Sequence, residues 1–299
     1  MTKEKSGTVV KEEDSRLERI RNLPVDEFVS RYIPTDLLDK TFHCPPLKGP
    51  SISSSTDSAP NAEPEGERKG QQEGQQAEES GLPTKYSFSV YSPDTIPQTY
   101  FEGCFDLIEY TSSAAYKASP SFRWSCRQKR EEMSLHAMMY LIVRDTAAEQ
   151  QEGEDGRPTR PISREATRDR RRGKRLRFQP SRNGSRMTDL NYGVGGFISF
   201  MPTEEEGVPV LYLYEIHIHP RFQNRGIGTI LMQALEDIAR NTGILRKTML
   251  TVFRSNEGGR RFYERLGYRR DEESTPSPMS LRGGGVREPD YYILYKDIN

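Results

Sequence analysis

Two groups of residues in this 299-residue sequence have the types and spacing that chemistry requires. The first is QNRGIG at 223–228, which stands between an apolar segment and an amphipathic one. Glycines here let the backbone approach a ligand closely, and the unpaired N–H groups at a helix start attract anions. A pyrophosphate would fit such a turn. Alternatively, Gly226 and Gly228 serve only to allow a tight connection between strand and helix.

The second group surrounds Glu215, a carboxylate inside the apolar, aromatic segment VPVLYLYEIHI at 208–218. Such a carboxylate is a candidate general base that takes a proton directly or through one water. The alternative is a structural role, with Glu215 at a strand edge paired to Arg254 or Arg221.

Strict alternation along a strand would put Tyr212 and Tyr214 on one face and Glu215 on the other. A shared site therefore requires a distortion, and we predict a β-bulge near Tyr214. Tyr212 and Tyr214 would then lie on the same face as Glu215. Both tyrosines would equally suit ordinary core packing.

A metal site is not expected. His217 and His219 share a strand face, but no third ligand stands at a suitable spacing. The three cysteines, Cys44, Cys104 and Cys126, form no CxxC pair and are odd in number. This argues against a disulfide framework and for a reducing compartment.

The hydrophobic pattern predicts a sheet with interleaved helices, an α/β or α+β fold. Strands are expected at 85–91, 137–143, 195–200, 208–218, 249–253 and 290–296, and helices at 15–33, 98–116, 226–243 and 256–268. Gly243 and Gly267 are the expected helix ends. Residues 1–48 are expected to be a helical segment packed on the core. Residues 49–84 and 146–187 are polar and of low complexity, so we expect both to be disordered insertions. The first precedes a domain at 85–299, and the second lies within that domain.

The overall composition excludes partners selected by net charge. Lys and Arg number 44 and Asp and Glu 44, so the formal net charge is +0 and no global field attracts nucleic acid or a membrane. No apolar run approaches about 20 residues, and the first residues are charged, so neither a membrane span nor a signal peptide is expected.

The pattern Gln-x-x-Gly-x-Gly, preceded by LYLYEIHIHP and followed by MLTVFRSNEGGRRFYERLGY, resembles the acetyl-CoA motif of the GNAT acetyltransferase superfamily. The chain has neither the GxxxxGK[ST] nor the GxGxxG motif of nucleotide-binding proteins. Four segments, WSCRQKREEM, YLYEIHI, LTVFRSNEGGRRFYE and the stretch from DEESTPSPMS to DYYIL, are similar to the N-alpha-acetyltransferase D branch. That branch acetylates the amino-terminal serine of histone tails beginning Ser-Gly-Arg-Gly.

The resemblance implies a GNAT domain at 85–299, with a mixed central sheet flanked by helices. It implies acetyl-CoA as acetyl donor and a strand at 208–218 that splays from its neighbour to pair with the pantetheine arm. The cofactor contacts so implied are Ile216, His217, Ile218, Gln223, Asn224, Arg225, Gly226, Ile227, Gly228, Thr229, Thr251, Asn256 and Tyr263. For Tyr263, core packing is an equal alternative.

The substrate wall implied by the resemblance comprises Tyr116, Phe122, Trp124, Tyr212, Ser280 and Tyr291. For Trp124, buried packing is the more common fate. An arginine in the substrate calls for an acidic partner. Thr203 falls where the family has an acidic residue, so Glu205, or Glu204, is the candidate replacement.

The resemblance therefore predicts acetyl transfer from acetyl-CoA to the amino-terminal serine of histone tails, with Glu215 as base. Tyr214 would contact the incoming amine or polarise the thioester. The alternatives are a GNAT enzyme for a lysine side chain or a small amine, and a catalytically idle module that binds CoA or histone. Histone tails are the expected partners, with the ribosome or the nucleosome as the setting and the nucleus and cytoplasm as the location. The basic run at 168–177 suits a nuclear import signal, a contact with nucleosomal DNA, or a solvated loop.

Overall fold

The computed structural model describes residues 14–39, 42–43, 85–146, 193–280 and 286–298. The insertion predicted at 49–84 and, beyond Thr146, the one at 146–187 lie outside the described residues. The basic run at 168–177 lies outside them too.

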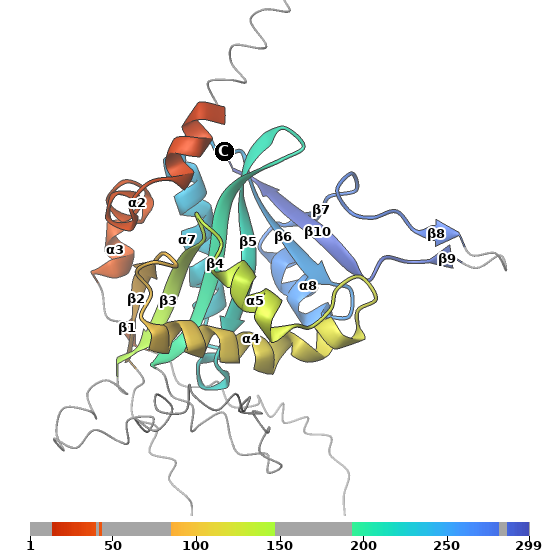
Figure 1. Cartoon of the computed structure of the whole chain (residues 1–299), viewed down its shortest axis with the longest axis horizontal. Helices are drawn as coiled ribbons and strands as arrows, with labels where there is room; N and C mark the ends of the chain where they lie inside the picture. The colour runs from red at the N-terminus through yellow and green to blue at the C-terminus, as the bar shows by residue number, and fades with distance from the viewer. Residues whose placement is uncertain (1–13, 40–41, 44–84, 147–192, 281–285, 299) are drawn as a thin grey trace, which may run out of the picture.

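A twisted eight-stranded sheet in the order β1-β2-β3-β4-β5-β6-β10-β7 forms the centre of the described part (Figure 1). Its strands are β1 Phe42–His43, β2 Lys85–Tyr91, β3 Met139–Asp145, β4 Val194–Glu205, β5 Val208–Ile218, β6 Lys247–Phe253, β7 Arg269–Arg270 and β10 Tyr291–Asp297. Neighbouring strands are antiparallel except β5 and β6, which are parallel. Two short strands, β8 Met279–Ser280 and β9 Val286–Arg287, form a separate hairpin.

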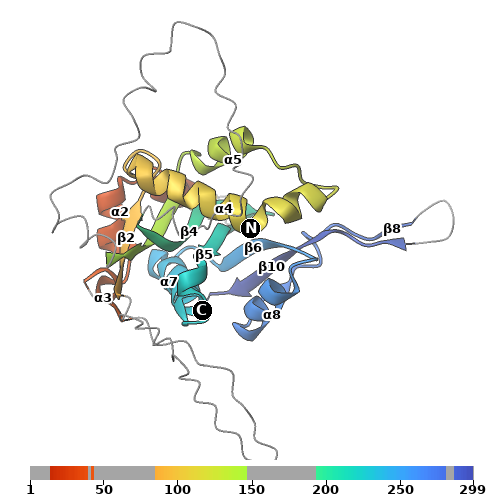
Figure 2. The same ribbon diagram turned by 90° about the horizontal axis from the view of Figure 1, so that it is seen from below.

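Helices cover both faces of the sheet, which confirms the expected α/β architecture (Figure 2). One face carries α4 Gln98–Ala118 and α5 Cys126–Met133; the other carries α2 Val25–Tyr32, α7 Ile227–Thr242 and α8 Glu257–Arg265. Shorter elements are the helix at 14–21, α3 Thr35–Leu38 and the 3₁₀ turn η3 Pro220–Phe222. No helix in the described ranges has the length and apolar character of a membrane span.

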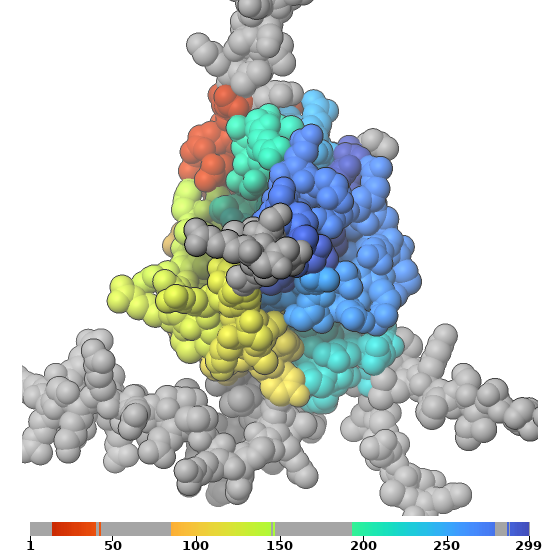
Figure 3. All heavy atoms as spheres, turned by 90° about the vertical axis from the view of Figure 1, so that its right-hand side faces the viewer, coloured from red at the N-terminus to blue at the C-terminus, as the bar shows by residue number. Residues whose placement is uncertain are grey.

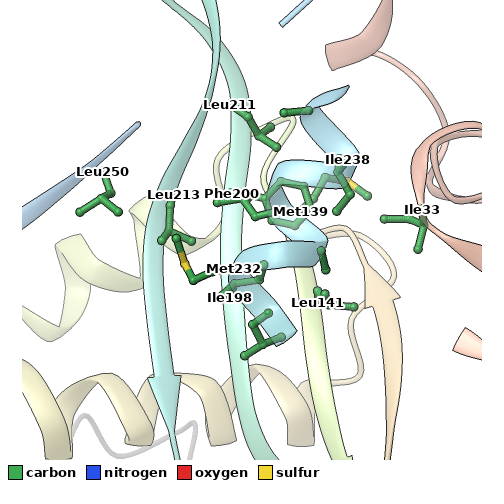
Figure 4. Packing of buried hydrophobic residues seen from close by; sticks show 14 of the residues in the cluster. Ile33, Met139, Leu141, Ile198, Phe200, Leu211, Leu213, Met232, Ile238 and Leu250 are labelled. Atoms are coloured by element: carbon green, nitrogen blue, oxygen red, sulfur yellow. The ribbon is translucent and has the colours of Figure 1, made fainter. Parts of the chain in front are cut away.

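The two faces hold separate apolar clusters. Apolar residues of α7 recur three and four apart, so one stripe of the helix packs on the sheet (Figure 4). Met232 and Ile238 of α7 lie there with Ile198 and Phe200 of β4. The N-terminal helices join this cluster through buried residues such as Phe28. The α4 cluster contains Cys104, Phe105, Leu107, Ile108, Met133, Met138, Tyr140, Ile142, Val194 and Phe197.

Helices α7 and α8 end next to the glycines predicted to terminate them. Gly243 ends α7 with φ of 68°, and Gly267 follows α8 with φ of 90°. Both lie in the left-handed region, where glycine has no Cβ to clash with the backbone.

Candidate active site

The β-bulge predicted near Tyr214 is confirmed. In the β4–β5 ladder Ser199 pairs with Glu215 and Phe200 with Leu213, so Tyr214 is the extra residue. The bulge shifts the alternation by one position. Glu215 therefore shares the α4 face of the sheet with Tyr212 and Tyr214, while Leu213 faces the α7 cluster.

The splaying of β5 from β6 implied by the resemblance is also present. Their pairing runs only from Val210–Lys247 to Leu213–Leu250, after which β6 pairs with β10 alone. A cavity of about 350 Å³ opens beyond that point. It is lined by Tyr212, Leu213, Tyr214, Glu215, Ile216 and His217 of β5, by Leu250, Thr251, Val252 and Phe253 of β6, and by Ser112, Tyr116, Phe122, Glu132, Glu205, Asn256 and Tyr263.

Glu215 is buried at 7% exposure and hydrogen-bonded on both carboxylate oxygens. Lys129 Nζ of α5 donates to Oε1 at 2.8 Å, and His217 Nε2 lies 2.6 Å from Oε2. The Tyr116 hydroxyl approaches Oε1 at 3.4 Å. The alternative prediction of an arginine partner, Arg254 or Arg221, was wrong: a lysine and a histidine pair with Glu215.

Lys129 bridges two carboxylates. Its ammonium is 2.7 Å from Glu132 Oε1, 2.8 Å from Glu215, and donates to the Tyr116 hydroxyl at 2.9 Å. Burial alone would lower the pKa of Lys129, but Glu215, Tyr116 and Glu132 outweigh burial and raise it. The ammonium is therefore charged at any physiological pH.

Glu215 is likewise ionised at physiological pH. Burial alone would raise the pKa of this carboxyl, but Lys129 and His217 outweigh burial and lower it to about 2. Glu215 thus accepts hydrogen bonds at every working pH without first losing a proton. The same low pKa limits its strength as a base.

The tyrosines of the cavity keep their hydroxyl protons. Burial raises the pKa of Tyr212 to about 12, and its hydroxyl lies 2.6 Å from Thr251 Oγ1. Burial also raises the pKa of Tyr214 and Tyr263. These side chains are neutral hydrogen-bond donors at physiological pH.

Aromatic rings from three parts of the chain gather at one side of the cavity. The Phe253 ring centroid lies 5.0 Å from that of Tyr116 and 5.6 Å from that of Phe122, and Phe122 lies 5.0 Å from Tyr291. Trp124 instead stacks on Phe105 behind Tyr116 and is not among the cavity-lining residues.

The candidate acidic residue, Glu205, lies at the β4–β5 turn, which Figure 3 shows in green above the α4–α5 region and beside the C-terminal elements. Glu205 lines the cavity, and burial together with Glu206 raises the pKa of its carboxyl. Thr203 pairs with Val210 inside the ladder and does not line the cavity. Ser280 belongs to β8, and its side chain is outside the described part.

The glycine turn lies at the other end of β5, directly before α7. Gly226 is the N-cap of α7 with φ of 81°, and no side chain caps this helix start. The side-chain amide of Gln223 donates to the Ile218 carbonyl at 2.9 Å, which ties the turn to β5. The structure thus joins Ile216, His217, Thr251, Asn256 and Tyr263 to Glu215 in one cavity. Ile218 and the residues from Gln223 to Thr229 are not among its lining residues and continue the chain from the end of β5.

Gly226→Ala is expected to lower the free energy of unfolding by about 1–2 kcal/mol, because an L side chain resists this left-handed conformation. The added Cβ would meet no atom within 4 Å, so the loss comes from the backbone alone. Gly258→Ala in α8 is the matched control, since there too nothing lies within 4 Å and φ is not positive. It should raise stability by up to about 1 kcal/mol. Urea unfolding of both variants measures the difference, and equal effects would contradict the strain argument.

Lys129, Glu132 and Phe253 are site residues that sequence reasoning did not select. A signal for Lys129 was present, since it stands four residues before the buried Met133 and so shares its helix face. Within the described ranges, no group of three or more His, Cys, Asp or Glu residues is placed to hold a metal ion.

Part of the chain is similar to known acetyltransferases. Residues 155–268 match the model of the acetyltransferase (GNAT) family. N-alpha-acetyltransferase 40 of Saccharomyces cerevisiae is 39% identical over 127 residues, covering 33% of this chain and 44% of the relative. The match thus spans less than half the length of that curated relative.

Two solved structures align over most of the chain at low identity. Arabidopsis thaliana NAA60 in complex with acetyl-CoA is 12% identical with a TM-score of 0.42, covering 72% of this chain and 99% of that one. An acetyltransferase from Streptococcus agalactiae is 11% identical with a TM-score of 0.43, covering 71% and 98%. Values this low support no transfer of ligand or substrate. Over residues 155–268, the chain is similar to the GNAT family of acetyltransferases.

Proposed function

We propose that this protein transfers the acetyl group of acetyl-CoA to the free α-amine at the amino terminus of another protein. The observation that carries the proposal is the cavity between the splayed strands β5 and β6, with the ionised carboxylate of Glu215 in its wall. A buried acceptor beside an opening of this size suits an amine nucleophile.

The residues on the β6 side of β5 fit the donor. Beyond Leu213 that edge of β5 has no strand partner in the described part, so the backbone of Ile216, His217 and Ile218 is available to the pantetheine arm. The turn from Gln223 to Thr229 would hold the diphosphate, because no side chain accepts a hydrogen bond from the first N–H groups of α7. Thr251, Asn256 and Tyr263 would contact the remainder. When bound, acetyl-CoA supplies the thioester carbonyl that an amine attacks.

Glu215 would hold the substrate amine and accept its proton, directly or through one water. The N–C bond forms as the C–S bond breaks. The nitrogen then loses a second proton, and the leaving thiolate takes this proton up. Tyr214 and Tyr263 would donate hydrogen bonds at the carbonyl and the sulfur, since burial keeps both hydroxyls protonated.

The substrate proposed is a histone-type tail beginning Ser-Gly-Arg-Gly. Its first two residues are small enough for an aromatic vestibule formed by Tyr116, Phe122 and Tyr291, and Glu205 would pair with the arginine. The name of the yeast relative supports α-amine transfer. Histone tails as partners, the ribosome or nucleosome as setting, and location in the nucleus and cytoplasm belong to the same proposal.

A mass-spectrometric assay on two peptides tests the proposed function. Both begin Ser-Gly-Arg-Gly and contain a lysine further on, and one has an acetylated terminus. We expect one acetyl group on the free terminus and no product from the capped peptide. Acetylation of the capped peptide would favour a lysine acetyltransferase. No turnover of either peptide or of small amines, with acetyl-CoA still bound, would favour an idle binding module.

A further inference from the structure

His217 lies behind Glu215 and is held at both ring nitrogens. The residue is buried at 7% exposure, and its ring centroid is 5.6 Å from that of Phe197 on β4. Nε2 lies 2.6 Å from Glu215 Oε2, and Nδ1 lies 2.6 Å from Thr111 Oγ1 on α4. The histidine therefore links the candidate base to a hydroxyl on a different element.

The Thr111 hydroxyl has one hydrogen and two acceptors within reach. Its oxygen is 2.7 Å from the Leu107 carbonyl and 2.6 Å from His217 Nδ1. A hydroxyl donates only one hydrogen bond, and a neutral imidazole has one donor and one acceptor nitrogen. The direction of this hydroxyl is thus coupled to the protons on His217.

Two states keep the bonds of His217 to Glu215 and Thr111; the charged state also keeps the Thr111–Leu107 bond, and the neutral state gives that bond up. If Thr111 donates to Leu107, then Nδ1 must donate to Thr111 and Nε2 must donate to Glu215, which requires a charged imidazolium. If Thr111 donates to Nδ1, the ring is neutral and only Nε2 donates to Glu215. The states differ by one proton on Nδ1. Thr111 is an exposed residue, so this proton has a route to solvent.

We propose that Thr111 and His217 form a positioning pair whose single proton controls Glu215: the site is resting when His217 is charged and active when it is neutral. The proposal rests on the proposed function. In the charged state Glu215 faces two cations, Lys129 and His217, which reduces its affinity for the amine proton. Loss of the Nδ1 proton leaves one cation, and Glu215 becomes the stronger acceptor.

Three elements contribute groups that face His217. Its own strand contributes Glu215, α4 contributes the Thr111 hydroxyl, and β4 contributes the uncharged Phe197 ring. Lys129 and Glu132 of α5 act through Glu215. Ion pairing outweighs burial and holds Lys129 charged and Glu215 ionised, so the proton that distinguishes the two states is the one on His217 Nδ1.

His217→Gln tests the pair, since a glutamine amide can donate to Glu215 and accept from Thr111 but cannot become charged. The measurement is log(kcat/KM) against pH for a peptide beginning Ser-Gly-Arg-Gly. The wild-type acid limb should approach a slope of about 2, one proton from the substrate amine and one from His217, and the variant about 1. His219→Gln, which removes another buried histidine two residues on, should keep the wild-type slope.

Equal slopes in the wild type and His217→Gln would overturn the proposal. An activity-independent measurement is the nitrogen-detected NMR titration of the histidine rings in the full chain, with His217 assigned through the variant. We expect both His217 nitrogens protonated at low pH and the Nε2–H tautomer at high pH. A neutral Nδ1–H tautomer would overturn the proposal even for an active enzyme. The expected titration without any peptide turnover would uphold the proton exchange of the Thr111–His217 pair and overturn the proposed function.

Discussion

Glu215→Gln is expected to lower kcat for amino-terminal acetylation by roughly 10²–10⁴-fold, because the amide accepts no proton from the amine. The low end of that range is favoured, since Lys129 and His217 lower the pKa of Glu215 to about 2 and make it a weak base. Steady-state kinetics on the free-terminus peptide gives kcat, and calorimetry gives the affinity for acetyl-CoA. That affinity should change little, because the proposed donor contacts are on the strand backbone and the glycine turn.

Glu236→Gln is the matched control. Glu236 of α7 is also a buried glutamate paired to a lysine, with Lys296 Nζ at 2.7 Å, but it does not line the cavity. It should keep the wild-type kcat. If Glu215→Gln were as active as this control, Glu215 would not be the base.

Lys129→Met is expected to lower the free energy of unfolding by about 3–5 kcal/mol, the usual result of removing one partner of a buried ion pair. Lys129 contacts two carboxylates, so its loss leaves Glu215 buried with His217 alone and removes the cation between Glu215 and Glu132. Urea unfolding at neutral pH measures the loss. Lys296→Met removes a partly exposed lysine that pairs with Glu236, and it should cost less.

The stability difference between wild type and Lys129→Met should shrink in acid. The pKa of Glu215 is about 2 in the folded protein, below about 4.3 for an ordinary glutamate, so its pairing stabilises the fold above that ordinary value. The stabilisation is lost as the pH falls towards 2. A Lys129→Met protein as stable as the wild type at neutral pH would show that the pair contributes nothing net.

The double variant Lys129→Met/Glu215→Gln separates the two effects. Removal of both charges should cost less stability than the sum of the single changes, because the two side chains are in direct contact. Activity should stay as low as in Glu215→Gln alone. Recovery of stability without activity would assign Lys129 to positioning and Glu215 to the chemistry.

Local pattern was enough to predict most elements. The strand expected at 208–218 is β5 itself, and α7 and α8 end beside the predicted Gly243 and Gly267. These features depend on the periodicity of nearby residues and on the conformational freedom of glycine. Even the bulge at Tyr214 was predictable, because two tyrosines and a carboxylate of one site could not otherwise share a face of the strand.

The partners of Glu215 were decided by tertiary structure alone. Lys129 lies 86 residues from Glu215 in sequence, and Thr111 lies 106 residues from His217. No periodicity connects such positions. Whether a buried carboxylate pairs with an arginine or a lysine depends on how α4 and α5 pack over β5. The sequence by itself determined where the strands, helices, turn and bulge form, because neighbouring residues control backbone geometry; the fold decided which distant charges meet, because only packing brings them within hydrogen-bond distance.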